Sequence, residues 1–418
     1  MIPNLTEHVP LDAIDLCDLD RFQHDSQHAA WKTLRDEAPV WRQTLPDGGH
    51  FWSLTRYRDI RPFLKNVNSY SSQHGTILAV AGGDSAGGRT INLMDNPRHR
   101  QIRVPTIRTM SNHVVRERAP RVREHIRHLI EPCYDGEVDF ADLMLHIPMV
   151  AIGEVLGIPT ELWQWIPGWT MAGVAPEDPD YSRGTSGDTL QQAHHNLFGM
   201  FSELIADRRR KPSDDLISML IDLRIDGEPL DDQTILLNCY SFVMGASTTT
   251  PHTANHTILA LAERPEIWNR LRGDLFAGRP VLETLLDEGL RWSTPTNHLM
   301  RRSTEPVVID GVDIDAGELI VAWIASANRD EDIFADPYTF DPWRRPNPHI
   351  AFGSGPHYCI GGPAARVALI ELFDELLTNF DSLQVTGEVR HLRSNFINGI
   401  TRLPLIARPA RQLVQEAS

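Results

Sequence analysis

The chain is poor in cysteine and has no segment long and apolar enough to cross a membrane. Its 418 residues include four cysteines, at positions 17, 133, 239 and 359, and no C-x-x-C pair. This excludes the dense disulfide framework of small secreted domains. No window approaches the ~18 uncharged apolar residues of a membrane-spanning helix, and the amino terminus has no signal-peptide pattern. We therefore expect a cytoplasmic protein without membrane contact.

Basic residues are scarce relative to acidic ones. Lys and Arg number 40 against 56 Asp and Glu, which gives a formal net charge of −16 and argues against general binding of nucleic acid. Hydrophobic residues make up 41% of the chain and charged residues 23%, which excludes a disordered or fibrous protein. Length alone suggests two or three domains. Because no repeat or linker divides the sequence, we instead expect one monomeric domain over residues 1–418.

Helical patterns outnumber strand patterns, which predicts a mainly α fold. The expected helices are Asp25–Glu37, Val114–Glu131, Val150–Leu156, Leu190–Arg208, Gln233–Ala262 and Pro265–Leu275. Strand-like runs, expected to form one small sheet, are Pro39–Gln43, His50–Leu54, Val307–Ile309, Val312–Ile314 and Ile320–Ile324. Two loops rich in Gly, Ser, Asp and Pro are candidates for lids over a site: Ala79–Arg89 and Val174–Asp188.

Cys359 differs from the other cysteines in its surroundings. Gly353, Gly355 and Gly361 permit tight backbone geometry around it, and Pro363 suits the first turn of a following helix. The free N–H groups and the dipole at such a helix start favour a thiolate. For an arbitrary lone cysteine, a buried structural thiol is the commoner interpretation. The glycine-rich turn favours a ligand instead.

The segment around Cys359 resembles the haem-ligand signature of the cytochrome P450 family, F-G-x-G-x-H-x-C-x-G. The matching residues are Phe352, Gly353, Gly355, His357, Cys359 and Gly361. The resemblance extends over nearly the whole chain. Further family motifs occur in the expected order: E-x-x-R at Glu288 and Arg291, then Ala327–Asp330, Phe334–Pro337 and Gly399–Pro404.

One departure from the family pattern concerns the partner of Glu288. Thr339 stands where many members carry an arginine that pairs with this glutamate. We expect Arg344 or Arg345 to supply the missing charge.

The resemblance implies a haem b cofactor with the Cys359 thiolate as metal ligand, O2 as co-substrate and electrons that come ultimately from NAD(P)H. It implies a P450-type helical domain with small β-sheets. In that fold the haem lies buried between a long distal helix, about residues 231–262, and the Cys-ligand loop 352–361 with the proximal helix.

Buried haem propionates require cationic or hydrogen-bonding partners. The residues that match the family's propionate-binding positions are His99, Arg103, Arg301 and His357. Arg302 is the alternative to Arg301 if the match is shifted by one. Asn96 replaces a proline in the motif that contains His99 and Arg103.

The distal helix departs from the family pattern at the oxygen site. Members usually read A-G-x-[DE]-T where this chain has Met244 to Thr248. Gly245 leaves room for oxygen, and the Thr248 hydroxyl can bind oxygen or hold a water. Ser247 replaces the acid and can relay a proton but not store one. Protons would therefore arrive through water, another side chain or the substrate.

Pro251 has a structural consequence for the same helix. It lacks an N–H for the carbonyl of Ser247, so it should kink the helix and open it at Gly245 to Ser247. Neighbouring hydroxyls can satisfy the freed backbone groups. The alternative is a kinked core helix whose hydroxyls all turn to the backbone.

These motifs predict a haem-thiolate monooxygenase that hydroxylates or epoxidises a mid-sized organic substrate, of the kind found in secondary metabolism. The missing acid leaves two alternatives: a peroxide-driven reaction, or oxidative C–C, C–N or C–O bond formation. A non-catalytic haem sensor is the least favoured. The expected pocket is apolar with polar anchors at Asn297 and His298, and its residues are Thr76, Ile77, Leu78, Val80, Val243, Met244, Ala246, Asn297, His298, Leu299, Phe396 and Ile397.

The expected partners are a small-molecule or carrier-tethered substrate and a separate electron donor. The family resemblance points to a ferredoxin or flavodoxin with its reductase. A basic cluster on the helix near the haem would steer an acidic donor, and it consists of Arg98, Arg100, Arg103 and Arg108. An ordinary solvated face is the alternative for these arginines.

Overall fold

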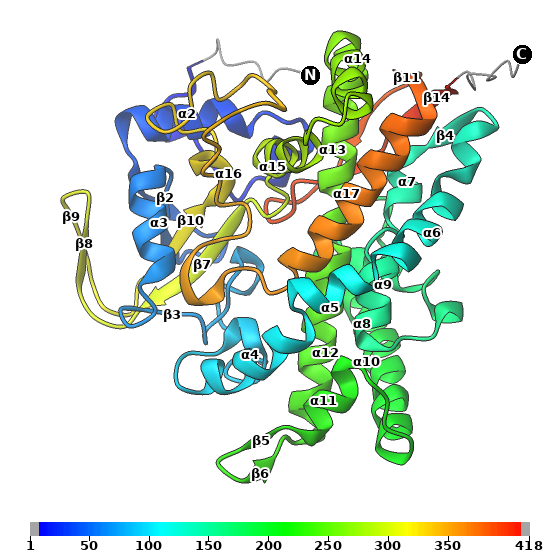
Figure 1. Ribbon diagram of the computed structural model, residues 1–418. Helices are drawn as coiled ribbons and strands as arrows, with labels where there is room; N and C mark the ends of the chain where they lie inside the picture. Colours follow the sequence, from blue (N-terminus) through cyan, green and yellow to red (C-terminus); the bar gives the residue numbers. More distant parts are fainter. Residues whose placement is uncertain (1–7, 411–418) are drawn as a thin grey trace, which may run out of the picture.

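A small mixed β-sheet occupies one side of the structure and long helices occupy the other (Figure 1). The computed structural model describes residues 8–410. The sheet has the order β1-β2-β10-β7-β3, with β2 and β10 parallel and the other pairs antiparallel. Its strands are β1 (Val40–Thr44), β2 (His50–Leu54), β3 (Tyr70–Ser71), β7 (His298–Ser303) and β10 (Leu319–Trp323).

The prediction of one small sheet was wrong for two of its members. β8 (Val307–Ile309) and β9 (Val312–Ile314) pair only with each other. Asp310 and Gly311 between them both have positive φ, 48° and 79°, which is the geometry of a tight two-residue hairpin. The remaining strands form small sheets elsewhere: β4 (Glu137–Asp139) with β11 (Phe380–Val385) and β14 (Pro404–Pro409), β5 (Arg224–Ile225) with β6 (Glu228–Pro229), and β12 (Arg390–His391) with β13 (Ile400–Arg402).

Helices dominate the fold, which confirms the predicted mainly α class. They are α1 (Leu19–Gln23), α2 (Gln27–Glu37), α3 (Tyr57–Lys65), α4 (Arg98–Thr109), α5 (Asn112–Glu117), α6 (Ala119–Ile130), α7 (Phe140–Met144), α8 (Glu154–Leu156), α9 (Ile166–Val174), α10 (Ser186–Arg210), α11 (Leu216–Asp222), α12 (Asp232–Ser247), α13 (Thr250–Ala262), α14 (Pro265–Phe276), α15 (Leu282–Ser293), α16 (Ile324–Ala327) and α17 (Gly362–Asn379). None of the helices within residues 8–410 has the length and apolarity that a membrane crossing needs.

Two predicted helices are each divided in the structure. The helix expected at Val114–Glu131 is broken at Arg118 into α5 and α6, and Pro120 lies in the first turn of α6, where its missing N–H is tolerated. The helix expected at Gln233–Ala262 is broken into α12 and α13. In Figure 1 these two continue one another through the molecule, with α17 beside α13.

The break between α12 and α13 confirms the predicted effect of Pro251 but not its position. Gly245 to Ser247 remain helical, and the chain leaves the helix at Thr248 and Thr249. Thr249 has φ −124° and ψ −49°. Pro251 lies in the first turn of α13, where no N–H is needed. The helix therefore restarts just before the proline instead of opening one turn earlier.

Candidate functional site

Cys359 lies in a tight loop that leads into α17, as its sequence context predicts. The Cys359 N–H donates to the carbonyl of Phe352 at 2.9 Å, which closes the loop. At Gly355, which has φ 79°, an added Cβ would lie 2.7 Å from the Cα of Lys65. A glycine is thus required there both by backbone conformation and by the close approach of α3.

Cys359 is an exposed residue whose thiol has stabilising groups around it. The residue as a whole is exposed, while burial raises the pKa of its thiol. Hydrogen bonds from the backbone of Gly361 and Gly362 and the charge of Arg103 act in the opposite direction on that pKa. These groups favour a thiolate once a cation is bound to the sulfur.

Four basic side chains converge beside this loop, and we call His99, Arg103, Arg301 and His357 the cationic cradle. The rings of His99 and His357 stack with centroids 4.1 Å apart. Burial, together with nearby positive charge, lowers the pKa of His99 to about 4 and that of His357 to about 3. Both rings are therefore neutral at pH 7 in this arrangement.

The cationic cradle has too few negative partners. Arg301 is only 3% exposed, and its guanidinium donates to the carbonyl of Phe63 at 3.1 Å. Asp95, whose charge acts on Arg301, already accepts hydrogen bonds from Ser71 and the backbone of Ser72. Burial lowers the pKa of Arg301 to about 10.

His99 adds a second sign that a ligand is missing from the cradle. Its Nε2 is buried and has no hydrogen-bond partner within the described residues. Buried cations and orphaned nitrogens are costly unless an anion pairs with them. The cradle consequently suits a bulky anionic group such as the propionates of haem.

The structure distinguishes Arg301 from its neighbour Arg302. Alternation along β7 turns Arg301 into the core, whereas Arg302 points the other way and donates to the carbonyl of Gly317 at 3.0 Å. Arg103, on α4, also turns inward and donates to the carbonyl of Tyr358. Arg103 is therefore part of the cradle, while Arg98, Arg100 and Arg108 of the predicted basic cluster are exposed.

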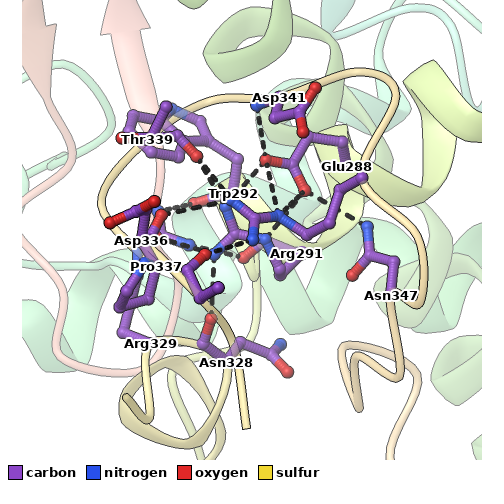
Figure 2. A network of polar contacts seen from close by, with 12 residues as sticks. Glu288, Arg291, Trp292, Asn328, Arg329, Asp336, Pro337, Thr339, Asp341 and Asn347 are labelled. Carbon is purple, nitrogen blue, oxygen red and sulfur yellow. Dashed lines mark hydrogen bonds and ion pairs between the residues drawn. The ribbon is translucent and has the colours of Figure 1, made fainter.

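Glu288 and Arg291, both fully buried, form the centre of a polar cluster that we call the arginine network (Figure 2). Two guanidinium nitrogens of Arg291 donate to the two Glu288 oxygens at 2.8 and 2.7 Å. The same guanidinium donates to the carbonyls of Asn328, Pro337 and Thr339. Thr339 thus contributes its backbone in place of a side-chain charge.

Arg344, and not Arg345, supplies the second charge to Glu288. Its Nε lies 3.2 Å from Glu288 Oε2, whereas Arg345 is exposed. Asn347 and the backbone N–H of Asp341 complete the hydrogen bonds to the carboxylate at 3.1 and 2.8 Å. The arginine network ties α15 to the segment that leads into the Cys359 loop.

The predicted oxygen site lies at the end of α12. Gly245 is exposed, and an added Cβ there would meet no atom within 4 Å. The hydroxyls of Thr248 and Thr249 donate to the carbonyls of Met244 and Gly245 at 2.9 and 2.7 Å. The Met244 carbonyl also accepts its helical bond from the Thr248 N–H, so only the Thr249 hydroxyl, on the Gly245 carbonyl, matches the expected capture of a freed backbone group. The Thr248 oxygen keeps lone pairs that can accept a further bond. The Ser247 hydroxyl is buried and has no hydrogen-bond partner among residues 8–410.

Three segments of the predicted substrate pocket come together. The Asn297 N–H donates to the carbonyl of Phe396 at 2.8 Å, and the Leu78 N–H donates to His298 Nε2 at 3.1 Å. His298 Nδ1 lies 3.1 Å from the carbonyl of Asn395. Both ring nitrogens of His298 are thus engaged with backbone, so it holds segments together and leaves no nitrogen for a substrate.

The other predicted pocket residues differ in their surroundings. Asn297 is 1% exposed, and both of its side-chain amide atoms lack hydrogen-bond partners in the described part of the chain, so it remains suited to anchor a polar group. Val243 and Ile397 are fully buried in the core. Partly accessible side chains are those of Thr76, Ile77, Val80, Met244, Ala246, Leu299 and Phe396.

Sequence reasoning missed an apolar surface beside Cys359. Val104 and Ile107 of α4 are 43% and 44% exposed, and Tyr358 is 44% exposed. Val104 and Ile107 lie three residues apart between Arg100 and Arg108, so these four share one helix face. In the sequence, the feature that could have indicated this surface is the spacing of two apolar residues between arginines on one helix.

Comparison with known proteins gives consistent matches along nearly the whole chain. The family model for Cytochrome P450 matches residues 167–404. The chain is 32% identical to cytochrome P450 NovI of Streptomyces niveus, with 94% of this chain and 96% of that protein covered. It is 30% identical to linalool 8-monooxygenase of Pseudomonas putida, with 94% and 99% covered.

Solved structures agree with these sequence matches. P450 OxyD, involved in the biosynthesis of vancomycin-type antibiotics, superimposes with a TM-score of 0.84 at 30% identity, with 95% of this chain and 100% of that chain covered. A Mycobacterium marinum cytochrome P450 in complex with pseudoionone gives a TM-score of 0.87 at 26% identity, with 96% and 99% covered.

Proposed function

The chain belongs to the cytochrome P450 family, and we propose that it hydroxylates or epoxidises a mid-sized organic substrate with O2 and electrons from a ferredoxin. Membership makes it an oxidoreductase of the monooxygenase type that uses haem with a cysteine thiolate ligand, O2 and electrons derived from NAD(P)H. The observation that carries the proposal is an exposed Cys359 beside the cationic cradle, in which Arg301 is buried with one carbonyl partner and His99 Nε2 has no partner among residues 8–410.

In this proposal Cys359 holds the iron and the cationic cradle holds the propionates. Bound haem would supply the reduction and cleavage of O2, with the thiolate donating electron density. Arg301 and Arg103 provide permanent charge, and His99 offers its unpartnered Nε2. The backbone N–H groups of Gly361 and Gly362 stabilise the thiolate.

The open face of α12 is the proposed reaction site for O2 and substrate. Gly245 leaves space for them, and the Thr248 oxygen can accept a hydrogen bond from a water. Asn297 orients a polar group of the substrate through its unpartnered amide. The neighbouring apolar side chains exclude water around the reacting C–H bond.

The substrate class is proposed from the pocket and from the relatives together. Curated relatives include linalool 8-monooxygenase and a methyl-branched lipid omega-hydroxylase of Mycobacterium tuberculosis. A mid-sized natural-product intermediate, free or carrier-tethered, suits an apolar pocket with one buried amide. A screen of free and tethered candidates, read by the spin-state shift of the haem, tests this. A spin-state shift that occurs only with small hydrocarbons would contradict this substrate class.

A second candidate function is a peroxide-driven or bond-forming oxidation. Ser247 at the usual position of an acid favours it, because proton delivery from a stored carboxylic proton is absent there. The neighbour OxyD acts in antibiotic biosynthesis. Efficient product formation with hydrogen peroxide alone, at rates that match those with O2 and donor, would favour this alternative.

We propose that the electron donor docks over Arg100, Val104, Ile107, Arg108 and Tyr358. An apolar centre flanked by arginines suits an acidic donor such as a ferredoxin. In the double variant Arg100→Glu with Arg108→Glu, reduction by ferredoxin should slow by about 10-fold at low salt, and added salt should narrow the difference. Arg42→Glu, on the exposed side of β1, is the control. If reduction slowed equally in the double variant and in the Arg42→Glu control, this face would be excluded as the docking site of the donor.

We also retain the interpretation of the chain as one cytoplasmic, monomeric domain. Contacts between distant segments support a single unit. Arg393 pairs with Asp20 at 2.7 Å, and Asn395 donates to the carbonyl of Leu16 at 3.1 Å. Gel filtration of the haem-loaded protein tests the monomer.

A further inference from the structure

Four histidines outside the cationic cradle lie along one buried route, and we call His28, His391, His256 and His252 the histidine file. His252 and His256 are one turn apart on α13 and are 0% and 8% exposed. His391 lies on β12, and its ring centroid is 5.9 Å from that of His256. His28, on α2, is 7% exposed.

Each member of the histidine file has a buried ring nitrogen without a hydrogen-bond partner within the described residues. The atoms are Nδ1 of His28, Nδ1 of His391, Nε2 of His256 and Nε2 of His252. The Ile400 N–H donates to Nδ1 of His252 at 3.3 Å. In the neutral ring the proton therefore lies on Nε2, the atom that has no acceptor.

Other unpartnered polar atoms lie next to the histidine file. Asn255, adjacent to His256, has a buried Oδ1, and Arg329 has a buried Nε, and neither atom has a hydrogen-bond partner between residues 8 and 410. Buried polar atoms in native proteins are normally satisfied by protein or by ordered water. Because such atoms here are concentrated along one route, a connected group of waters explains them better than separate defects.

Burial keeps three members of the histidine file, His28, His252 and His256, neutral. Burial lowers the pKa of His28 and of His252 to about 4 and lowers that of His256 well below its ordinary value. Positive charge on His391 and Arg329 acts in the same direction on both His28 and His256, and Arg35 does so on His28. A neutral imidazole has one donor and one acceptor nitrogen, so it can pass a proton without holding charge.

The route has a defined entrance and exit. At the entrance, His28 Nε2 lies 3.7 Å from Asp25 Oδ1, and the Asp25 side chain is 25% exposed. At the exit, His252 lies in the first turn of α13, and the break at Thr248 and Thr249 comes directly before that helix. The break between α12 and α13 separates it from the open face at Gly245.

We propose that the histidine file holds ordered water and carries protons from the surface at Asp25 to the Thr248 hydroxyl. This inference rests on the proposed function, since the overall reaction RH + O2 + 2 e⁻ + 2 H⁺ → ROH + H2O consumes two protons per turnover. Each passage takes one proton from solvent at the Asp25 end and releases one at Thr248, and no electron moves along it. The file replaces the carboxylic acid that Ser247 does not provide.

The first test needs no variant. In a high-resolution crystal structure of the haem-loaded protein, ordered waters should lie within about 3.2 Å of the four unpartnered nitrogens. They should connect into one chain that ends at Thr248. The proposal would be overturned if no ordered water lay beside these ring nitrogens, or if the waters did not form one connected chain.

The second test breaks the file in its middle. His256→Leu should reduce product formed per NAD(P)H by about 10-fold and raise peroxide release, since delivered protons contribute at least this much to catalysis. His256→Gln, which still holds water, should recover part of the loss. His146→Leu, a half-buried histidine outside the file, should have no effect. If His256→Leu formed as much product per NAD(P)H as the wild type, the proposed proton relay would be contradicted.

Controls separate the failure of the relay from the failure of the proposed function. In each variant the ferrous-CO band and the substrate-induced spin shift should match those of the wild type. If the wild type itself lacks the thiolate band, the proposed function fails. If His256→Leu does not fold, His391→Leu at the half-buried strand β12 provides the same test, with the same outcomes.

Discussion

Two buried polar clusters of this protein differ in how completely their hydrogen bonds are satisfied. In the arginine network, Arg291 and Glu288 are both fully buried, and Arg291 is paired by a carboxylate and three carbonyls. In the cationic cradle, Arg301 is 3% exposed and donates to one carbonyl, and His99 Nε2 has no hydrogen-bond partner in the part of the chain that the structure describes. The first cluster is complete within the protein, and the second requires a ligand.

This difference separates structural from functional charge. A buried ion pair that is closed by further hydrogen bonds contributes to the fold, because removal of either partner leaves an uncompensated charge. A buried cation without an anion is unfavourable until its ligand binds, so its presence indicates a binding site. The same residue type, arginine, thus has opposite roles 10 positions apart in the sequence, at 291 and 301.

The largest effect should come from breaking the arginine network. Arg291→Met leaves Glu288 charged and buried, so we expect a loss of about 3–5 kcal/mol in the free energy of unfolding. Urea denaturation measures it. Arg123→Met removes a partly exposed ion pair with Glu371 and Asp374 and should cost about 1 kcal/mol or less. Equal losses in the two variants would remove the distinction between network and surface pairs.

A smaller effect on stability, but a clear effect on the cofactor, should follow Arg301→Met. Removal of an unpaired buried charge should change the unfolding free energy of the haem-free protein by about 1 kcal/mol or less. Haem should leave the loaded protein about 10- to 100-fold faster, since a hydrogen bond to a charged group contributes about 1.5–3 kcal/mol.

Transfer of haem to apomyoglobin, followed by absorbance, measures this release. Arg302→Met, on the other side of β7, is the matched control and should leave the rate unchanged. If Arg301→Met destabilises the protein as Arg291→Met does, with no change in haem release, the cradle is another structural cluster.

The smallest change is expected at Thr248. Thr248→Ala removes a hydroxyl that already has a backbone partner, so stability should change by no more than about 1 kcal/mol. The fraction of electrons that reaches product should nevertheless fall by about 10-fold, with more peroxide released. Thr248→Ser keeps the hydroxyl and should retain most of the coupling. Unchanged coupling in Thr248→Ala would remove Thr248 from proton delivery.

Local patterns were sufficient to predict much of this molecule. The glycines and proline around Cys359 predicted the tight loop before α17, because each specifies backbone geometry by itself. Pro251 predicted the interruption of the distal helix for the same reason. The family motifs predicted which positions are buried together, and the structure places Glu288 and Arg291 as expected.

Features that depend on pairing between distant segments could not be predicted. The choice of Arg344 over Arg345 depends on the path of the loop around Glu288. The engagement of both His298 nitrogens depends on the approach of residues 78 and 395. The histidine file combines α2, α13 and β12, which no local pattern connects. In each case the partner is set by tertiary packing.

The most direct test of the central claim is the ferrous-CO absorption spectrum of the wild type and of Cys359→His. Thiolate ligation moves the Soret band of the CO complex to the red. We predict this red-shifted band in the wild type and its loss in Cys359→His, with the cationic cradle still able to retain haem. A wild type without the band, or a Cys359→His variant that keeps it, would contradict the assignment of Cys359 as the haem ligand.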